Sequence, residues 1–380
     1  MAGNGLSAIE RLTWHYDHPF ALAVEKDREG IPVAGITSNT VPCELLRAAG
    51  FFPVILNPRP GPAPLAGRFM EEGVFTARIR GIFEGLASGA WPILKLVVIP
   101  RTSEQEQKLY LYLREVARQG LVPKLPYLSF YNLLHARSPE AEEYGIERTH
   151  DLKQYLEQLA GRAMKPADLA RAVCESNQAR QAIGGLLSLR EGPEPRLTGT
   201  EALPLIGAVY FMGPAQFAKF AAEAASELAG RPPARGVRLL IKGTPLHHTG
   251  LHRAIESHRA VVVAEDDWWG SRCLGREIVA EGDLVRSVFE AYYGAVPSPR
   301  VFPCEIADGW FFAAAAKVDG VVFYLPPEDD VLGWDYPRLR AALAQRGIPS
   351  ILVREDAAEE LSSECHQRIE EFASKLPVRS

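Results

Sequence analysis

Residues 260–272 read AVVVAEDDWWGSR, a run of apolar residues that ends in three carboxylates, two tryptophans and an arginine. The apolar part shows no alternation of polar and apolar positions, which is typical of a strand buried on both faces in a parallel sheet covered by helices. Ligands of such sheets bind beyond the carboxyl ends of the strands. The stretch therefore predicts a buried strand over Ala260–Asp266 and a candidate binding site in the loop that follows it.

Similar apolar runs occur in two groups along the chain. The predicted strands are Val33–Ser38, Phe52–Asn57, Leu94–Pro100 and Pro126–Phe130 in the first half, and Val237–Gly243, Ala260–Asp266, Gly320–Pro326 and Ser350–Arg354 in the second. The predicted helices are Cys43–Ala49, Met70–Ala87, Glu104–Arg118, Thr249–His258, Asp335–Arg346 and Ala357–Lys375. Both halves follow the order strand, short helix, strand, long excursion, strand, helix, strand. We therefore predict an α/β fold with two small doubly wound parallel sheets, of Rossmann or flavodoxin type, that arose by duplication.

The segment between the two halves has a helical composition. Leucines and alanines recur at helical spacing through Lys153–Leu189, and the proline-containing cluster Arg231–Gly236 marks the end of the segment. We expect three parts: a first α/β domain with an N-terminal helix over residues 1–138, a helical lid or connector over 139–235, and a second α/β domain over 236–380. A lid between two such domains favours a site in the cleft between them.

The composition of the 380 residues disfavours several classes of protein. A formal charge of −5 without a basic stripe argues against nucleic acid as a partner, and no apolar run approaches the roughly 20 residues that cross a membrane. Glu10, Arg11 and Asp17 stand where a signal peptide needs an apolar centre, so we expect a cytoplasmic protein. The five cysteines form no Cys-x-x-Cys pair, which disfavours disulfides and zinc sites. The chain has no Gly-x-Gly-x-x-Gly or Walker sequence for direct use of NAD or ATP.

The loop after the first predicted strand offers hydroxyl and amide groups. Ser38 and Asn39 precede the helix that begins at Cys43, so their side chains and the helix N-terminus could hold an acyl carbonyl or a phosphate. Ser38 or Thr40 could equally cap that helix.

The loop after the sixth predicted strand combines the candidate binding residues Asp266, Trp268, Trp269 and Arg272. The indoles suggest a face for an aromatic or adenine ring. One of the carboxylates could instead pair with Arg272 for structural reasons alone. His248 and His252, four residues apart after the fifth strand, could bind a metal on one helical face, but no third ligand is evident and capping or solvated histidines are the simpler interpretation.

Four further segments carry a family resemblance. They are VPCELLRAAGFFPVIL (residues 41–56), LKQYLEQLAGR…LARAVCESNQAR (152–180), GTPL…LHRAIESHRAVVVAEDDWWGSR (243–272) and DGVVFYLP…WDYPRLRAALAQRGIPSILVRED (319–356). Together and in this order they resemble the 2-hydroxyacyl-CoA dehydratase family, which includes the core subunits of the ATP-dependent benzoyl-CoA reductases.

The resemblance implies a dimer of related subunits with a CoA thioester between them, [4Fe-4S] clusters that pass single electrons, and a separate ATP-hydrolysing activator. Ser38, Asn39 and Glu44 match the region that holds the thioester or serves as a base in relatives. We expect Glu44 to move the proton, because a partly buried carboxylate at a helix start can have a pKa near neutral. A first-turn glutamate favoured by the helix dipole is the alternative interpretation.

The chain departs from the family in its cysteines. The resemblance implies three cysteine ligands for each cluster, near Val74–Thr76, within IPRTSEQ where this chain has Ser103, and after DGVVF where it has Tyr324. Hydroxyl oxygens are poor ligands for a soft iron–sulfur cluster. We therefore expect a subunit that binds no cofactor or metal of its own and shapes the acyl-CoA pocket beside a cluster-bearing sister subunit.

Other interpretations stay open. The complex could be an oxidoreductase that resembles benzoyl-CoA reductase or a lyase that resembles 2-hydroxyacyl-CoA dehydratase. The chain could also be a redox-inactive acyl-CoA-binding or assembly protein of the same fold. A last alternative is an altered cofactor held through Cys273, Cys304 or His248.

Overall fold

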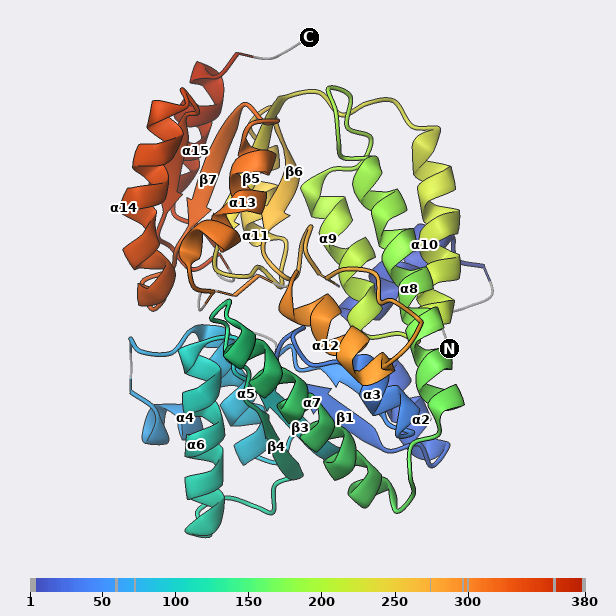
Figure 1. Ribbon diagram of the computed structural model, residues 1–380. Coiled ribbons are helices and arrows are strands. Elements are labelled where there is room, and N and C mark those ends of the chain that lie inside the picture. Colours follow the sequence, from blue (N-terminus) through green and yellow to red (C-terminus); the bar gives the residue numbers. More distant parts are fainter. Residues whose placement is uncertain are drawn as a thin grey trace.

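The computed structural model describes residues 5–58, 61–71, 73–273, 275–295, 297–298, 301–357 and 360–377. Each half of the chain forms a four-stranded parallel sheet, with the strand orders β2-β1-β3-β4 and β6-β5-β7-β8 (Figure 1). The strands are β1 (Val33–Ile36), β2 (Phe52–Ile55), β3 (Leu94–Pro100), β4 (Tyr127–Tyr131), β5 (Val237–Gly243), β6 (Ala260–Asp266), β7 (Gly320–Tyr324) and β8 (Ser350–Val353). All eight predicted strands are present. The α/β class with two doubly wound parallel sheets is confirmed.

The helices of the first half depend on local backbone signals. They are α1 (Ala8–Asp17), α2 (Ala21–Arg28), α3 (Cys43–Ala48), α4 (Pro64–Phe69), α5 (Ala77–Ala87) and α6 (Glu104–Arg118). The prediction of one helix over Met70–Ala87 is wrong at its start, because Gly73 has a φ of +74°, outside the helical region. The helix α5 begins only after its N-cap residue Thr76. Glu72, within the predicted range, lies outside the described residues.

Capping residues decide where the helices of the second half begin. These are α11 (Gly250–Glu256), α12 (Leu284–Tyr293), α13 (Cys304–Ala315), α14 (Asp330–Gln345) and α15 (Ser363–Lys375). The side chain of Asp329 accepts from the backbone N–H of Leu332, so α14 starts before the predicted Asp335. Ser362 caps α15 in the same way, so this helix starts after the predicted Ala357. Residues 358–359 of that prediction lie outside the described part of the chain.

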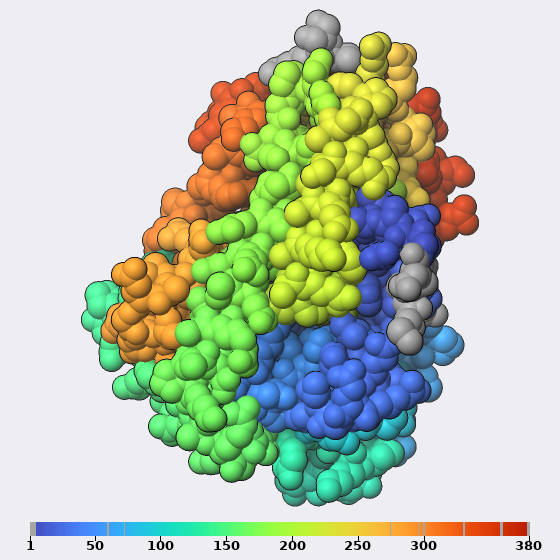
Figure 2. All heavy atoms as spheres, turned by 90° about the vertical axis from the view of Figure 1, so that its right-hand side faces the viewer, coloured from blue at the N-terminus to red at the C-terminus, as the bar shows by residue number. Residues whose placement is uncertain are grey.

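The middle of the chain forms a helical layer of α7 (Pro139–Ala160), α8 (Pro166–Ser188), α9 (Gly199–Gly207), the short 3₁₀ helix η1 (Ala208–Tyr210) and α10 (Pro214–Ala229). Figure 2 shows α8 and α10 side by side on the outer face, with the N-terminal part of the chain next to them. Helices from both halves pack on this layer: α1 contacts α9 and α10, α3 contacts α8, α11 contacts α9, and α12 contacts α7. The layer therefore joins segments from both halves.

The cores of the two halves differ in extent. One hydrophobic cluster runs from the first sheet through the helical layer and includes Trp268, Trp269 and residues of α12. Two smaller clusters lie on the two faces of the second sheet. Among the described residues, no helix is long and apolar enough to cross a membrane.

Candidate functional site

A cavity of about 420 Å³ is lined by residues that follow the carboxyl ends of strands from both sheets. Its wall includes the loops that follow β1 and β3 of the first sheet and those that follow β5, β6, β7 and β8 of the second. Parallel strands present their carboxyl ends at one edge of the sheet, so each half brings several loops to the same space. The cavity is large enough for a small-molecule ligand.

Ser38 and Asn39 are neighbours in the loop after β1 but face different spaces. Ser38 lines the cavity, and its hydroxyl is hydrogen-bonded to that of Thr102, 2.7 Å away. Asn39 donates from Nδ2 to the backbone carbonyl of Cys273 and lines a separate small cavity. Pro42 is the N-cap residue of α3, without a side-chain cap, so the capping interpretation of Ser38 does not hold.

Asp266 and Arg272 lie on the cavity wall as an ion pair that Lys242 joins. Lys242 Nζ donates to Asp266 over 2.6 Å, and Arg272 Nη1 donates to it over 2.8 Å. Burial acts to raise the pKa of Asp266, but the two cations outweigh burial and hold this pKa below its ordinary value. Asp266 is therefore an ionised anchor for the two cations.

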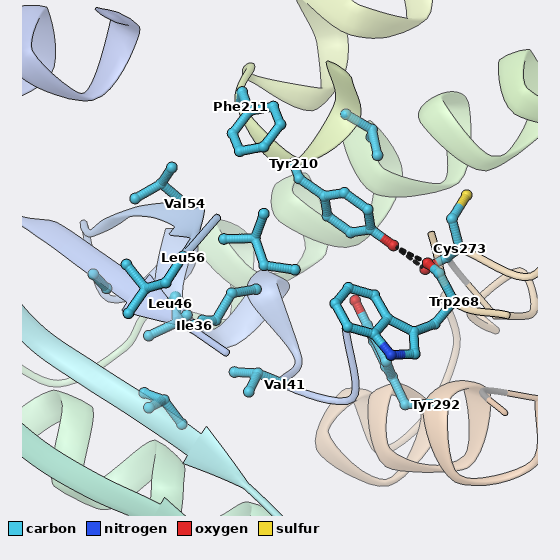
Figure 3. Packing of buried hydrophobic residues seen from close by; sticks show 14 of the residues in the cluster. Ile36, Val41, Leu46, Val54, Leu56, Tyr210, Phe211, Trp268, Cys273 and Tyr292 are labelled. Atoms are coloured by element: carbon cyan, nitrogen blue, oxygen red, sulfur yellow. Dashed lines mark hydrogen bonds between the residues drawn. The ribbon is translucent and has the colours of Figure 1, made fainter. Parts of the chain in front are cut away.

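The two adjacent tryptophans separate into a wall residue and a core residue. Trp268 lines the cavity, and the guanidinium carbon of Arg78 lies 5.1 Å from its ring centroid. Its backbone carbonyl accepts from Tyr210 Oη over 2.6 Å (Figure 3). Trp269 is 0% exposed, packs against Tyr16, Tyr210 and Phe211, and does not line the cavity. The sequence could not distinguish their roles, because both are apolar and lie in one loop.

Glu44 is 1% exposed and lies away from the large cavity. Its carboxylate accepts from Arg180 Nη2 over 3.1 Å and from Tyr292 Oη over 2.9 Å, beside a second cavity of about 30 Å³. Burial acts to raise the pKa of Glu44, but Arg180 and Arg47 outweigh burial and hold this pKa below its ordinary value. The direction is opposite to the near-neutral pKa expected from the sequence, because the sequence did not reveal the two arginines.

Glu265 anchors the second sheet to the helical layer. Arg190 forms two charge-assisted hydrogen bonds to its carboxylate, of 2.8 Å from Nη1 and 2.6 Å from Nη2, and both side chains are 1% exposed. His252 Nε2 lies 3.1 Å from the same carboxylate, so His252 belongs to this buried network. Among the described residues, no group of three His, Cys, Asp or Glu could hold a metal ion.

Several carboxyls on the cavity wall were not selected from the sequence, and two of them have a raised pKa. Burial raises the pKa of Glu106, which accepts from Thr37 Oγ1 over 2.8 Å. Burial and then the charge of Glu265 raise the pKa of Asp267 to about 7, although three backbone N–H groups donate to it. Glu106 stands three residues after Ser103, which is the spacing of a capping box. The sequence therefore indicates a structural role for Glu106 and does not reveal that this residue lies beside the cavity.

The positions where the resemblance implies cysteine ligands lie at the same cavity. Thr76, Ser103 and Tyr324 all line its wall. Ser103 Oγ accepts from the backbone N–H of Glu106 over 3.3 Å, and Tyr324 Oη donates to Asp356 Oδ1 over 3.3 Å. These hydroxyl groups do not suit an iron–sulfur cluster, and Cys304, which lines the same wall, adds only one thiol to them.

The cysteines and the histidine of the altered-cofactor alternative do not form one ligand group. Cys304 and His248 line the large cavity, whereas Cys273 is 1% exposed and does not line it. Burial lowers the pKa of His248 to about 4. Burial raises the pKa of Cys304 above its ordinary value, which disfavours the thiolate that binds metals.

Comparisons with known proteins agree on one family. The family model described as 2-hydroxyglutaryl-CoA dehydratase, D-component, matches residues 39–376 of this chain. The chain is also similar to the (R)-phenyllactyl-CoA dehydratase beta subunit of Clostridium sporogenes, with 19% identity over 228 residues. This match covers 59% of the present chain and 61% of the relative, so the chain spans less than two thirds of that protein's length.

Proposed function

Because the chain belongs to the 2-hydroxyglutaryl-CoA dehydratase D-component family, we propose that it is one subunit of an enzyme that acts on CoA thioesters. In this proposal a homologous sister subunit holds a [4Fe-4S] cluster, and a separate ATP-hydrolysing activator supplies its electrons. The present chain has no cluster of its own and contributes a wall of the acyl-CoA pocket.

The observation that carries the proposal is the position of Thr76, Ser103 and Tyr324 on the wall of one cavity. The family resemblance implies thiolates near Val74–Thr76 and at the positions of Ser103 and Tyr324, and this chain has no cysteine at any of them. Two of the hydroxyls are hydrogen-bonded within the chain, where they support the local backbone and a neighbouring carboxylate. A retained cavity without thiolates supports a subunit that shapes the pocket and leaves electron transfer to its partner.

Within this pocket we assign the thioester carbonyl to Ser38. Its hydroxyl lies on the wall and is held by Thr102, so a bound carbonyl oxygen would meet a donor of fixed position. We assign proton transfer to the nearby Glu106, because its raised pKa keeps a proton on the carboxyl over a wider pH range than in an ordinary glutamate. Glu44, with a lowered pKa and two buried partners, holds α3 to the helical layer.

The remaining wall residues give the pocket its shape. Trp268 offers an apolar face, and Asp266 fixes Lys242 and Arg272 at the edge of the second sheet. Asn39 ties the loop after β1 to the loop after β6. The matched family and the relative are both named as dehydratases, which favours dehydration over reduction as the reaction of the complex.

Reconstitution tests the proposal. The chain is produced without oxygen, alone and together with a cysteine-complete homologue and the activator, and (R)-phenyllactyl-CoA is offered with ATP. We expect turnover by the complex and none by the chain alone. Ser38→Ala should lower turnover about a hundredfold or more, the effect of losing one donor to the reacting carbonyl. Ser188→Ala, which changes an exposed hydroxyl bonded only to the carbonyl of Gly185, is the matched control. A chain that binds acyl-CoA but never supports turnover favours the redox-inactive binding protein.

A further inference from the structure

Four buried hydroxyl groups and one carboxyl lie together where the loops after β1 and β3 meet. The hydroxyls belong to Thr37, Ser38, Thr40 and Thr102 and the carboxyl to Glu106, and each of these residues is at most 3% exposed. Thr102 Oγ1 lies 2.7 Å from Ser38 Oγ and 2.5 Å from Thr40 Oγ1. Ser38 and Thr102 line the large cavity, whereas Thr40 does not. Three of the hydroxyls therefore form a chain that runs from the interior, at Thr40, to the wall, at Ser38.

The direction of this chain follows from the number of partners that each hydroxyl has. A hydroxyl group donates one proton and can accept two. Within the described part of the protein, the hydroxyl of Thr40 has one hydrogen-bond partner, Thr102, so Thr40 does not cap α3. If Thr40 accepted from Thr102, its own proton would be buried without an acceptor, which costs free energy. Thr40 therefore donates to Thr102, and Thr102 donates its single proton to Ser38.

Contacts from both halves of the chain hold Thr102 in place. Ser298 Oγ, from the second half, donates to the backbone carbonyl of Thr102 over 2.7 Å. The carbonyl of the preceding residue, Arg101, lies 2.9 Å from Nε2 of the buried His135. The donor that faces Ser38 thus has a fixed position, which restrains the rotation of the Ser38 hydroxyl.

Ser38 keeps its own proton to donate, because it accepts from Thr102. The carboxyl of Glu106 lies within hydrogen-bond reach of Ser38 on the cavity wall. We propose that Thr40 and Thr102 are positioning residues, which form a one-way hydrogen-bond chain and direct the proton of Ser38 toward the cavity side. The space beside Ser38 then suits a group that accepts, such as a carbonyl oxygen, and disfavours a group that only donates. The identity of this carbonyl as a thioester rests on the proposed function, whereas the direction of the chain does not.

Neutron diffraction from crystals of the full chain grown in D₂O tests the direction without any activity, because it locates the deuterium of each hydroxyl group. We expect the deuterium of Thr40 on the line to Thr102, and that of Thr102 on the line to Ser38. The deuterium of Ser38 should point away from Thr102. A deuterium of Ser38 on the line to Thr102, or one of Thr102 on the line to Thr40, would overturn the proposal.

Turnover of the reconstituted complex tests the positioning role. Thr102→Val keeps the shape of the side chain without its hydroxyl and should lower kcat about fivefold, the contribution of one hydrogen bond. Thr102→Ser returns the hydroxyl and should restore kcat. The matched control is Thr149→Val, because Thr149 is 0% exposed, its hydroxyl is bonded to Tyr131 and Gly145, and it does not line the cavity. This control should lower stability and leave kcat unchanged.

The outcomes separate the chain from the proposed function. A parent complex without turnover contradicts the proposed function alone, and the deuterium positions still decide the direction of the chain. If Thr102→Val does not fold, Thr40→Val takes its place, with an expected loss of about twofold in kcat because the polarisation of the chain is weaker. An unchanged kcat in the folded valine variant, or a Thr102→Ser variant as slow as Thr102→Val, would overturn the positioning role.

Discussion

The two sheets have the same strand order but carry different chemistry at their carboxyl ends. The loops of the first sheet present hydroxyl groups, such as those of Ser38 and Thr102. Arg78, at the start of α5, lies on the same wall and forms no ion pair within the described part of the chain. The loops of the second sheet present carboxylates and cations that pair with one another, as Asp266 does with Lys242. Both sheets therefore bring their loops to one cavity. A loop whose charged side chains pair with one another serves as framework, whereas a loop whose polar groups stay available can contact a ligand.

The largest expected loss of stability comes from breaking the buried ion pair between Arg190 and Glu265, which supports the second sheet. Arg190→Met leaves Glu265 buried without its main partner and should lower the free energy of unfolding by about 3–5 kcal/mol. Urea denaturation at neutral pH measures this loss. The control is Arg231→Met, which removes an exposed arginine paired with Glu201 and should cost at most about 1 kcal/mol. Equal small losses in both variants would mean that the second sheet does not depend on its paired charges.

A second test uses two neighbouring carboxyls with opposite pKa shifts. Arg190 outweighs burial and lowers the pKa of Glu265 from 4.5 to about 2, so its stabilisation is present above pH 4.5 and is lost as the pH falls toward 2. The pKa of Asp267 is raised from 3.8 to about 7, so its contribution is greatest below pH 3.8 and is lost as the pH rises to about 7.

Each of these shifts corresponds to about 3–4 kcal/mol across its pH range. Urea denaturation between pH 3 and 8 compares the parent protein with Asp267→Asn. As the pH rises toward neutral, the free energy of unfolding of the parent should fall relative to that of the variant, because the variant has no carboxyl that titrates at this position. An identical pH dependence of the two proteins would contradict the assigned titration of Asp267.

Glu44 sharpens the comparison with a smaller effect. Glu44 lies in the first half of the chain, but its carboxylate is buried and paired, with Arg180 and Tyr292, as carboxylates of the second half are. Glu44→Gln removes the charge that faces Arg180 and should lower the free energy of unfolding by about 1–3 kcal/mol, because a partly paired arginine remains buried. The exposed Glu142→Gln, at the start of α7, is the control. Unchanged stability together with lost turnover in the reconstituted complex would restore Glu44 as the residue that moves a proton.

The sequence predicts the sheets well because strands buried on both faces leave long apolar runs, and each predicted strand overlaps an observed one. It mispredicts the start of α5 because Gly73 takes up a left-handed backbone conformation that composition alone does not reveal. Ser38, Asp266, Trp268 and Arg272, chosen from the sequence because they lie at or after strand ends, line the cavity wall, and their role in binding stays a prediction.

Side-chain direction is the information that the sequence lacks. Asn39 and Trp269 are each one residue from a wall residue and point elsewhere, since adjacent residues of a loop face different sides. Glu44 meets partners 136 and 248 residues away along the chain, a pairing that no local pattern contains. The charge balance of the site, such as the two cations that share Asp266, becomes visible only when the fold brings these distant residues together.

The most direct measurement is the iron and acid-labile sulfide content of protein purified without oxygen, recorded together with its visible spectrum. It is made on the chain alone and on the chain co-expressed with a cysteine-complete homologue. Thr76, Ser103 and Tyr324 supply no thiolate to the cavity wall, so we expect no iron in the lone chain and iron in the complex. Stoichiometric iron and sulfide in the lone chain would contradict the assignment of this subunit as the cluster-free half.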